Sequence, residues 1–256
     1  MRIAVCCKGV PIDMAVDVVN NVDGDINYTG TDFYINEFDS YALETALNLK
    51  QRYDAETVVI SLGPLRSQEV LYFSLAKGID KAIRIDGQTG RPEMIASGLL
   101  PVLKEVDPQI ILVGVQSEDW MGAEVGIYLS QALNMSRAYA VMEIMEINDT
   151  DVRVRKELGG GKTAEVILKL PAVLCIQSGI HPLQYISKGR LKKARSLPIN
   201  LGGSIDPKDV KDKIPGMTCY DVVGVAEPSR EGRAEMITGE RQEKAKKLIE
   251  IINKIA

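Results

Sequence analysis

The stretch QIILVGVQSEDWMGAEVGIYLSQALN, residues 109–134, decides the fold. It begins with six consecutive apolar or glycine residues, Ile110–Val115, a short β-branched run that predicts a strand buried on both faces. A polar turn follows over Gln116–Gly122. Apolar residues then recur at helical spacing: Val125, Leu129, Ala132 and Leu133. The stretch therefore predicts a strand, a tight turn and a helix in succession.

The turn before this predicted helix is a candidate anion-binding site. The first backbone N–H groups of a helix have no partner inside the helix, and the helix dipole is positive at that end. Such a place binds phosphate well. Our hypothesis is that the turn binds the phosphates of an adenine nucleotide or of FAD. The alternative is an ordinary loop between strand and helix, because the glycines form neither a dinucleotide-binding fingerprint nor a P-loop.

The composition of the whole chain restricts the class of protein. Its 256 residues are 45% hydrophobic and 26% charged, which is typical of a soluble globular protein with a sizeable core. The net charge of −4 argues against a general nucleic-acid-binding protein. No apolar run is long enough to span a membrane, and Met1–Cys7 is too short for a signal-peptide core. We expect a cytoplasmic protein.

The four cysteines have no CxxC spacing, so they predict neither a zinc site nor a disulfide framework. We interpret them as reduced, buried thiols: Cys6, Cys7, Cys175 and Cys219.

Strand-like and helical segments alternate along the first 135 residues. The predicted strands are Arg2–Cys7, Thr57–Leu62, Lys81–Ile85 and Ile110–Val115. With helices between them, these strands predict an α/β fold with a doubly wound parallel sheet. Ligands of such sheets bind outside the carboxyl ends of the strands. We therefore expect three segments to lie close together, joined by Asn36 from a helix start: Cys7-Lys8-Gly9, Ser61-Leu62-Gly63 and Gly114-Val115-Gln116.

Polar and breaker residues predict where the helices begin and end. Asn36 is expected to cap the first helix and Ser67 the second, which should stop at Gly78. Pro92 suits the first turn of the third helix. Pro101 falls within the same helical pattern and predicts a kink or a break there.

The periodicity changes after residue 140. Alternating segments predict an antiparallel meander, followed by one more buried strand: Val141–Ile147, Val152–Glu157, Thr163–Leu170 and Ala172–Ile176. From Gln177 the chain loses regular periodicity. A loop or small hairpin is expected earlier, over Asp23–Asp32.

The end of the chain predicts an arm and a helix. Residues 202–233 are rich in proline, glycine and charge, and Glu240–Ile255 follows with an amphipathic helical pattern. A lone amphipathic helix needs a surface to cover, either on its own domain or on another chain. We predict a nucleotide- or flavin-binding α/β domain over residues 1–200, and over residues 201–256 an arm and helix that pack on a partner subunit.

No catalytic machinery stands out. His181 is the only histidine, which excludes His-dependent triads and multi-His metal sites, and we predict no metal and no catalytic side chain. Any redox chemistry would come from a cofactor that the protein positions. A stand-alone adenylating or ATP-cleaving enzyme would need a glycine-rich ATP loop near the first strand, and CCKGVPID, residues 6–13, does not supply one.

A basic cluster, KGRLKKAR at residues 188–195, has three interpretations. It could be a solvated charged segment. A nucleic-acid patch is disfavoured by the net charge and the lack of interleaved aromatic residues. It could also be a docking loop for an acidic partner, with Leu191 as an apolar contact. The candidate docking residues are Lys188, Gly189, Arg190, Leu191, Lys192, Lys193 and Arg195.

Five segments together resemble the small (beta) subunit of electron-transfer flavoproteins. They are CCKGVP at 6–11, INEFDSYALETAL at 35–47, VVISLGP at 58–64, GVQSEDWMGAEVG at 114–126 and LKLPAVLCIQSGIHPLQYISKGRLKKAR at 168–195. The resemblance runs from residue 1 to about 200 and is weaker beyond. It implies a Rossmann-like fold related to adenine nucleotide alpha hydrolases, and a larger alpha subunit that carries FAD.

The resemblance further implies that the small subunit binds AMP or, in electron-bifurcating members, a second FAD. The candidate cofactor-binding residues are Cys7, Lys8, Gly9, Asn36, Ser61, Leu62, Gly63, Gly114, Gln116, Asp119, Gly122, Ala123, Glu124 and Val125. The basic cluster matches the family's recognition loop for partner dehydrogenases.

Departures from the family pattern refine this expectation. AMP-binding members carry Asn, Gln and Thr where this chain has Ala123, Glu124 and Val125, and bifurcating members more often read Ala-Gln-Val-Gly. We therefore favour FAD over AMP, and expect the Glu124 carboxylate to point away from the phosphates. Trp120 also departs, and could stack on a ring or pack against the partner subunit.

The docking segment departs as well. Lys188 stands where an apolar anchor is usual, which leaves that role to Leu191 or Ile186.

The expected function is electron transfer within a heterodimer. The FAD of the small subunit would receive electrons from NADH. They would pass to a low-potential acceptor, ferredoxin or flavodoxin, and to a flavin dehydrogenase partner of the acyl-CoA dehydrogenase type or another. The alternative is a non-bifurcating beta subunit that holds structural AMP while the alpha subunit's FAD carries electrons.

Overall fold

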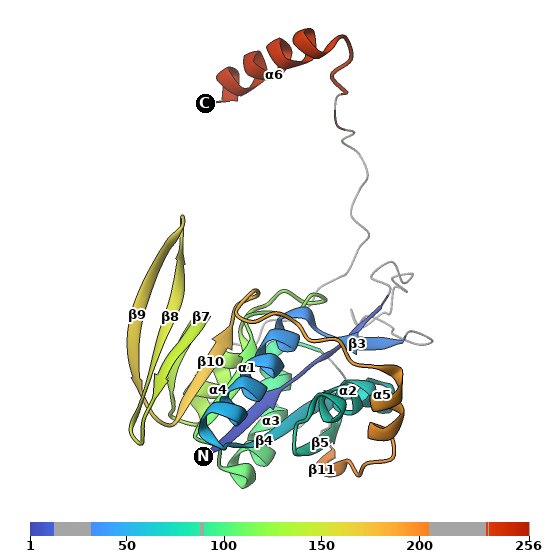
Figure 1. Cartoon of the computed structure of the whole chain (residues 1–256), viewed down its shortest axis with the longest axis vertical. Coiled ribbons are helices and arrows are strands. Elements are labelled where there is room, and N and C mark those ends of the chain that lie inside the picture. The colour runs from blue at the N-terminus through green and yellow to red at the C-terminus, as the bar shows by residue number, and fades with distance from the viewer. Residues whose placement is uncertain (13–31, 88–89, 205–233, 235, 256) are drawn as a thin grey trace.

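A nine-stranded sheet forms the centre of the part of the chain that the computed structural model describes, residues 1–12, 32–87, 90–204, 234 and 236–255 (Figure 1). Its strands lie in the order β11 (Asn200–Ser204), β5 (Lys81–Asp86), β4 (Glu56–Gly63), β1 (Arg2–Cys6), β6 (Ile110–Gly114), β10 (Ala172–Ile176), β7 (Ser136–Ile147), β8 (Asp151–Gly159) and β9 (Lys162–Lys169). Neighbours from β11 to β7 are parallel, and β8 is antiparallel to both β7 and β9. The predicted fold class, a doubly wound parallel sheet with an added antiparallel region, is confirmed.

Helices cover both faces of the parallel strands. On one face lie α1 (Glu37–Tyr53), α2 (Glu69–Lys77) and the short α5 (Lys188–Ala194). On the other lie α3 (Pro92–Val106) and α4 (Val125–Ala132). The inner strands β1, β6 and β10 are almost completely buried, as expected for strands of a parallel sheet with both faces covered.

The strand order reverses next to β1. The chain runs from β1 to β4 and β5 on one side of it, and then crosses to β6 on the other side. The carboxyl ends of β1 and β6 therefore border the topological switch, where open α/β sheets bind their ligands. A short antiparallel pair, β2 (Gly9–Pro11) and β3 (Phe33–Ile35), follows directly on the end of β1.

The strand β7 begins earlier than the sequence predicts. Its first half, Ser136–Val141, lies parallel to β10, and its second half pairs with β8. Ala140, near the middle, has a left-handed φ of 55°. The sequence pattern reveals only the more apolar second half. The following hairpin turns through Gly160 and Gly161, both at positive φ, which suits the two-residue turn that joins β8 to β9.

Neither residue predicted as a helix cap makes a side-chain capping bond. Asn36 occupies the position before α1, but its side chain makes no capping bond. Ser67 lies inside a short 3-10 helix, η1 (Leu65–Gln68), where its hydroxyl donates to the Pro64 carbonyl. The helix α2 therefore starts at Glu69, one residue later than a Ser67 cap predicts. The predicted stop at Gly78 is confirmed by its φ of 118°.

The helix α3 continues through Pro101, so of the predicted kink or break the break does not occur and the kink stays a prediction. Pro101 is exposed, while the residues around it pack against the sheet. This packing holds the helix on both sides of the proline, and tertiary contacts override the local preference.

The chain after Gln177 has more regular structure than the sequence predicts. The basic cluster forms α5, and residues 200–204 form the edge strand β11. The last predicted helix is confirmed as α6 (Arg241–Ile255). The predicted loop at 23–32, most of the predicted arm and Cys219 lie outside the described residues. The other three cysteines are free and buried, as expected. Among the described helices, none combines the length and apolarity that crossing a bilayer requires.

Candidate functional site

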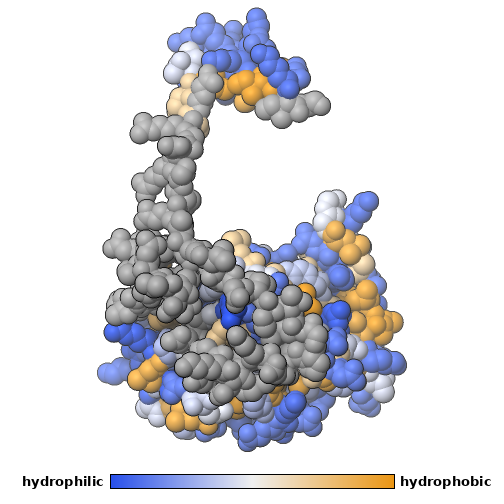
Figure 2. Space-filling model, turned by 180° about the vertical axis from the view of Figure 1, so that it is seen from behind, coloured by the Kyte–Doolittle hydropathy of each residue, from blue (hydrophilic) through white to orange (hydrophobic). Residues whose placement is uncertain are grey.

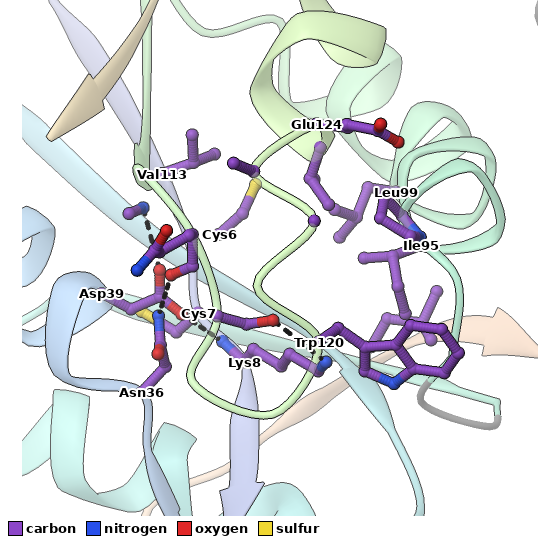
Figure 3. Close-up of a pocket in the computed structure, with 18 of the residues that line it drawn as sticks. Cys6, Cys7, Lys8, Asn36, Asp39, Ile95, Leu99, Val113, Trp120 and Glu124 are labelled. Atoms are coloured by element: carbon purple, nitrogen blue, oxygen red, sulfur yellow. Dashed lines mark hydrogen bonds between the residues drawn. The ribbon is translucent and has the colours of Figure 1, made fainter. Parts of the chain in front are cut away.

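A hollow opens at the carboxyl ends of β1, β4 and β6 (Figure 3). Its empty space, including the open mouth, is about 640 Å³. It lies at the topological switch, where the sequence predicts the ligand. One side is polar and is formed by the strand ends and the loop after β6, and the opposite side is apolar and is formed mainly by α3.

Most of the residues expected to bind the cofactor line this hollow. They are Cys7, Lys8, Asn36, Leu62, Gly114, Gln116, Gly122, Ala123, Glu124 and Val125. The other four do not line it: Gly9, Ser61, Gly63 and Asp119. Gly9 packs against η1, where a Cβ atom would lie 2.9 Å from the Cβ of Ser67. Asp119 is connected to the hollow through its ion pair with Lys8.

The apolar wall and one buried acid are site features that the sequence does not predict. Pro92, Ile95 and Leu99 line the hollow from α3 at helical spacing. The Trp120 ring lies on the same side of the hollow as Ile95 (Figure 3). That spacing is visible in the sequence, but nothing in it shows that this face of the helix borders a ligand site. Asp39 also lines the hollow, although its position suggests only a favourable charge in the first turn of α1.

The turn before α4 has an uncommon backbone. Met121 and Ala123 both have left-handed φ values, 50° and 58°, and flank Gly122, which does not. A left-handed conformation costs a residue with a side chain about 1–2 kcal/mol. Successive N–H groups in such turns form concavities that bind anions. Gly122 is required by space, because a Cβ atom would lie 2.8 Å from the Pro92 ring.

The first turn of α4 leaves its N–H groups available. The preceding residue, Glu124, makes no side-chain cap. Its carboxylate instead accepts a hydrogen bond of 3.2 Å from the Tyr128 hydroxyl, one turn along the helix. The turn and the helix start together present only backbone donors, since Ala123 and Val125 have apolar side chains.

A lysine provides positive charge at the polar side of the hollow. Lys8 Nζ lies 2.7 Å from Asp119 Oδ1 and 3.5 Å from Ser117 Oγ, and both charged side chains are mostly buried. Burial lowers the pKa of Lys8, and the charge of Asp119 opposes that shift. The second oxygen of Asp119 and the indole N–H of Trp120 are buried without a hydrogen-bond partner among the described residues.

Two side chains of the α1 start connect the strand ends (Figure 3). Asn36 donates from Nδ2 to the Gln116 carbonyl at 2.9 Å and accepts from the Glu118 N–H at 3.1 Å. Asp39 accepts from the N–H groups of Lys8 and Gly114 at 2.8 and 2.9 Å. Burial raises the pKa of Asp39 to about 6, and these backbone bonds oppose the shift.

The thiols near the hollow are unsuited to nucleophilic chemistry. Burial, reinforced by the charge of Asp39, raises the pKa of Cys6 and Cys7, and burial raises that of Cys175 to about 12. These cysteines therefore stay protonated and inert. His181 lies in the loop after β10 and does not line the hollow. No cluster that could hold a metal ion occurs among the described residues. The arrangement is that of a binding site for an anionic ligand.

Comparison with known proteins identifies the family. The family described as "Electron transfer flavoprotein domain" matches residues 25–200, more than half of the chain. The chain belongs to the electron transfer flavoprotein family. It is 36% identical over 233 residues to the electron transfer flavoprotein subunit beta of Methylophilus methylotrophus, covering 86% of this chain and 85% of the relative. It is 32% identical over 197 residues to the subunit of the same name from Bradyrhizobium diazoefficiens, covering 74% and 78%.

Within this family fold, the hollow combines donors for an anionic group with an apolar wall. The left-handed turn, the α4 start and Lys8 offer N–H donors and positive charge for phosphate. The apolar side chains of Pro92, Ile95 and Leu99 offer a surface on which a ring can pack.

The candidate docking segment forms the helix α5, beside α2. The helix α5 packs on α2, Ala194 is buried, and Arg195 pairs with Glu69 at 2.8 Å. Leu191 and Ile186, expected as apolar anchors, pack inward against the core. Tyr185, just before them, is 85% exposed. Four basic side chains of this helix face solvent: Lys188, Arg190, Lys192 and Lys193.

Proposed function

We propose that the chain is the small subunit of a heterodimeric electron-transfer flavoprotein and binds FAD in the hollow. The observation that supports this best is the left-handed turn before α4, which offers backbone N–H groups opposite Lys8. Bound flavin would supply the electron-carrying chemistry, since the side chains around the hollow supply none. The chain's own residues bind the phosphates, exclude water and orient the ring system.

The composition of the turn favours FAD over AMP. Side-chain donors for a terminal phosphate are absent at Ala123 and Val125, so binding depends on backbone groups, which suit an internal diphosphate equally well. The long apolar wall from Pro92 to Leu99 gives a second ring system a surface to pack on. A beta subunit with structural AMP in the same hollow is the alternative.

Electron bifurcation is the activity that this cofactor implies. In our proposal NADH reduces the complex, one electron leaves to ferredoxin or flavodoxin, and the other passes through the alpha subunit's FAD to a flavin dehydrogenase. We propose a dehydrogenase of the acyl-CoA type or another flavin dehydrogenase, and a cytoplasmic location, which fits these soluble partners.

The test is a cofactor count on the heterodimer purified with its alpha subunit. Two FAD molecules per heterodimer are expected, measured by absorbance after nucleotide extraction and chromatography. One FAD and one AMP would contradict the bifurcating version and leave the electron-shuttling one. Absence of both nucleotides from this subunit would contradict the binding site itself.

Two surfaces are proposed to contact partners. The exposed basic side chains of α5 suit an acidic surface on the dehydrogenase. The helix α6 stands apart from the α/β domain, and its apolar residues gather on one side of it (Figures 1 and 2). Leu248, Ile249 and Ile252 are 49%, 58% and 54% exposed. An isolated amphipathic helix of this kind needs a surface to cover, and we propose the alpha subunit.

A further inference from the structure

Two buried polar side chains at the start of α1 do not perform the tasks that their positions suggest. Asn36 is 1% exposed and Asp39 is 5% exposed. An asparagine before a helix ordinarily caps it, which stabilises the helix by about 1 kcal/mol, and an acid in the first turn ordinarily favours the helix dipole from the surface. Here both side chains turn away from α1 toward the strand ends and the loop after β6.

The contacts of Asn36 fix the loop between β6 and the phosphate-binding turn. Both ends of its amide are used, one on the Gln116 carbonyl and the other on the Glu118 N–H. Its own N–H donates to the Lys8 carbonyl at 3.0 Å. One residue thus ties the end of β1 to the loop that leads into the turn at Met121–Ala123.

The contacts of Asp39 join the two strands that border the switch. One carboxylate oxygen accepts from the N–H of Lys8 after β1, and the other accepts from the N–H of Gly114 at the end of β6. The approach is so close that a Cβ atom on Gly114 would lie 2.6 Å from the Asp39 oxygen, so only glycine fits there. Lys8 is consequently held at both ends, its N–H by Asp39 and its Nζ by Asp119.

We propose that Asn36 and Asp39 are positioning residues of the nucleotide site: they pre-form the loop of residues 114–118 and the placement of Lys8, so that the phosphate-binding groups need no rearrangement when the ligand arrives. The inference rests on the proposed function and assigns Asn36 a role through the loop rather than on the ligand. Asn36 does not cap its helix and Asp39 buries a charge, and both features lower the local stability. Proteins accept such losses mainly at functional sites.

Near-isosteric variants test each residue. Asn36→Asp places an oxygen against the Gln116 carbonyl, and Asp39→Asn places an amide N–H against a backbone N–H. Each change turns an attractive contact into a repulsive one without changing side-chain size. Asn36→Ala, which removes both loop contacts and adds no charge, decides the test if either variant fails to fold.

Affinity is measured by titrating AMP and FAD separately into the heterodimer stripped of nucleotide. Each variant should weaken binding of the nucleotide that the wild type takes by roughly tenfold or more, the equivalent of one lost buried hydrogen bond. Glu37→Gln, an exposed change in the same helix turn, should leave affinity unchanged. Val152→Ala, a buried change in β8 at a distance from the hollow, is the control for a general loss of thermal stability.

A second readout separates positioning from general stability. Amide hydrogen exchange should accelerate in residues 114–118 of the variants, while exchange in β8 and β9 stays as in the wild type. Unchanged exchange in the loop, or an affinity loss no greater than that of Val152→Ala at equal melting temperature, would overturn the inference. If the wild-type complex binds neither AMP nor FAD, the proposed function fails, and the exchange comparison alone decides whether the pair fixes the loop.

Discussion

At position 39 a carboxylate is buried between the ends of two strands, and its titration should be visible in stability. Its pKa lies near 6 in the folded chain, against an ordinary value of 3.8, because burial disfavours the charged form. The folded state therefore binds more protons than the unfolded state between these two values. The contribution of Asp39 to stability is fully present below about pH 4 and is lost as the pH rises through 6.

Lowering the pH from 7 to 5 should therefore stabilise the wild type relative to Asp39→Asn. The expected gain in free energy of unfolding is about 1 kcal/mol, from the fraction of the carboxyl that becomes protonated. Urea unfolding of both proteins at the two pH values measures it, with Glu37→Gln as the control for an exposed acid. Parallel responses of wild type and Asp39→Asn would contradict the raised pKa.

Gly122 is the residue at which the turn tolerates least change. Gly122→Pro removes a backbone N–H donor and fixes φ, and even a Cβ atom would meet the Pro92 ring. The variant should lose its bound nucleotide, measured by extraction from the purified heterodimer. The control is Ala123→Gly, which relieves a left-handed residue and should keep the nucleotide and gain about 1 kcal/mol of stability. Normal nucleotide content in Gly122→Pro would place the phosphates elsewhere.

Single residues also show what a sequence can reveal about a site. The strand ends and the glycine turn are predictable, because their positions follow from the order of strands and helices. The hydrogen bonds of the Asn36 side chain to the loop are not predictable, since the same residue type at the same place ordinarily caps the helix. Asp39 likewise bonds to backbone groups that are 31 and 75 residues away, and no local pattern encodes that pairing.

At the scale of elements, α5 offers a test of the proposed docking surface. Reversing the exposed charges in Lys188→Glu, Arg190→Glu, Lys192→Glu and Lys193→Glu should raise the KM for the partner dehydrogenase and reduce its dependence on salt. Nucleotide content should stay normal, because these side chains lie outside the hollow. Steady-state transfer assays with the dehydrogenase measure the effect.

Charge reversal is preferable to deletion of the segment, since α5 buries Ala194 and part of Leu191 against the core. Reversal of four exposed lysines elsewhere, Lys81 in β5, Lys104 in α3, and Lys162 and Lys169 in β9, changes the net charge by the same amount and is the matched control. If the control variant slows transfer as much as the α5 variant, net charge rather than a specific surface determines docking.

The elements that the sequence predicts differ from those that it does not predict in what stabilises them. The central strands are apolar and β-branched, so β1, β4, β6 and β10 are recognisable without neighbours. The edge strand β11 contains two adjacent glycines and exists through its pairing with β5. The helix α5 has only seven residues, too few to form alone, and depends on packing against α2.

At the scale of the whole molecule, the C-terminal helix should determine assembly rather than ligand binding. A chain ending before Arg241 should keep its nucleotide but dissociate more readily from the alpha subunit, because the apolar side of α6 would be lost. Dilution followed by size-exclusion chromatography measures the dissociation. A truncated chain that holds the alpha subunit as tightly as the full chain would assign α6 to another surface.

No separate linker joins the antiparallel meander β7–β9 to the parallel part of the sheet. One continuous backbone, β7, serves as the outermost parallel strand in its first half and as the first hairpin strand in its second. Tyr139, in that first half, also donates through its hydroxyl to the Val115 carbonyl at 3.4 Å, within the loop of residues 114–118. Through β7 and this contact the hairpins are joined directly to the ligand-binding crevice, and heat should melt both in a single transition.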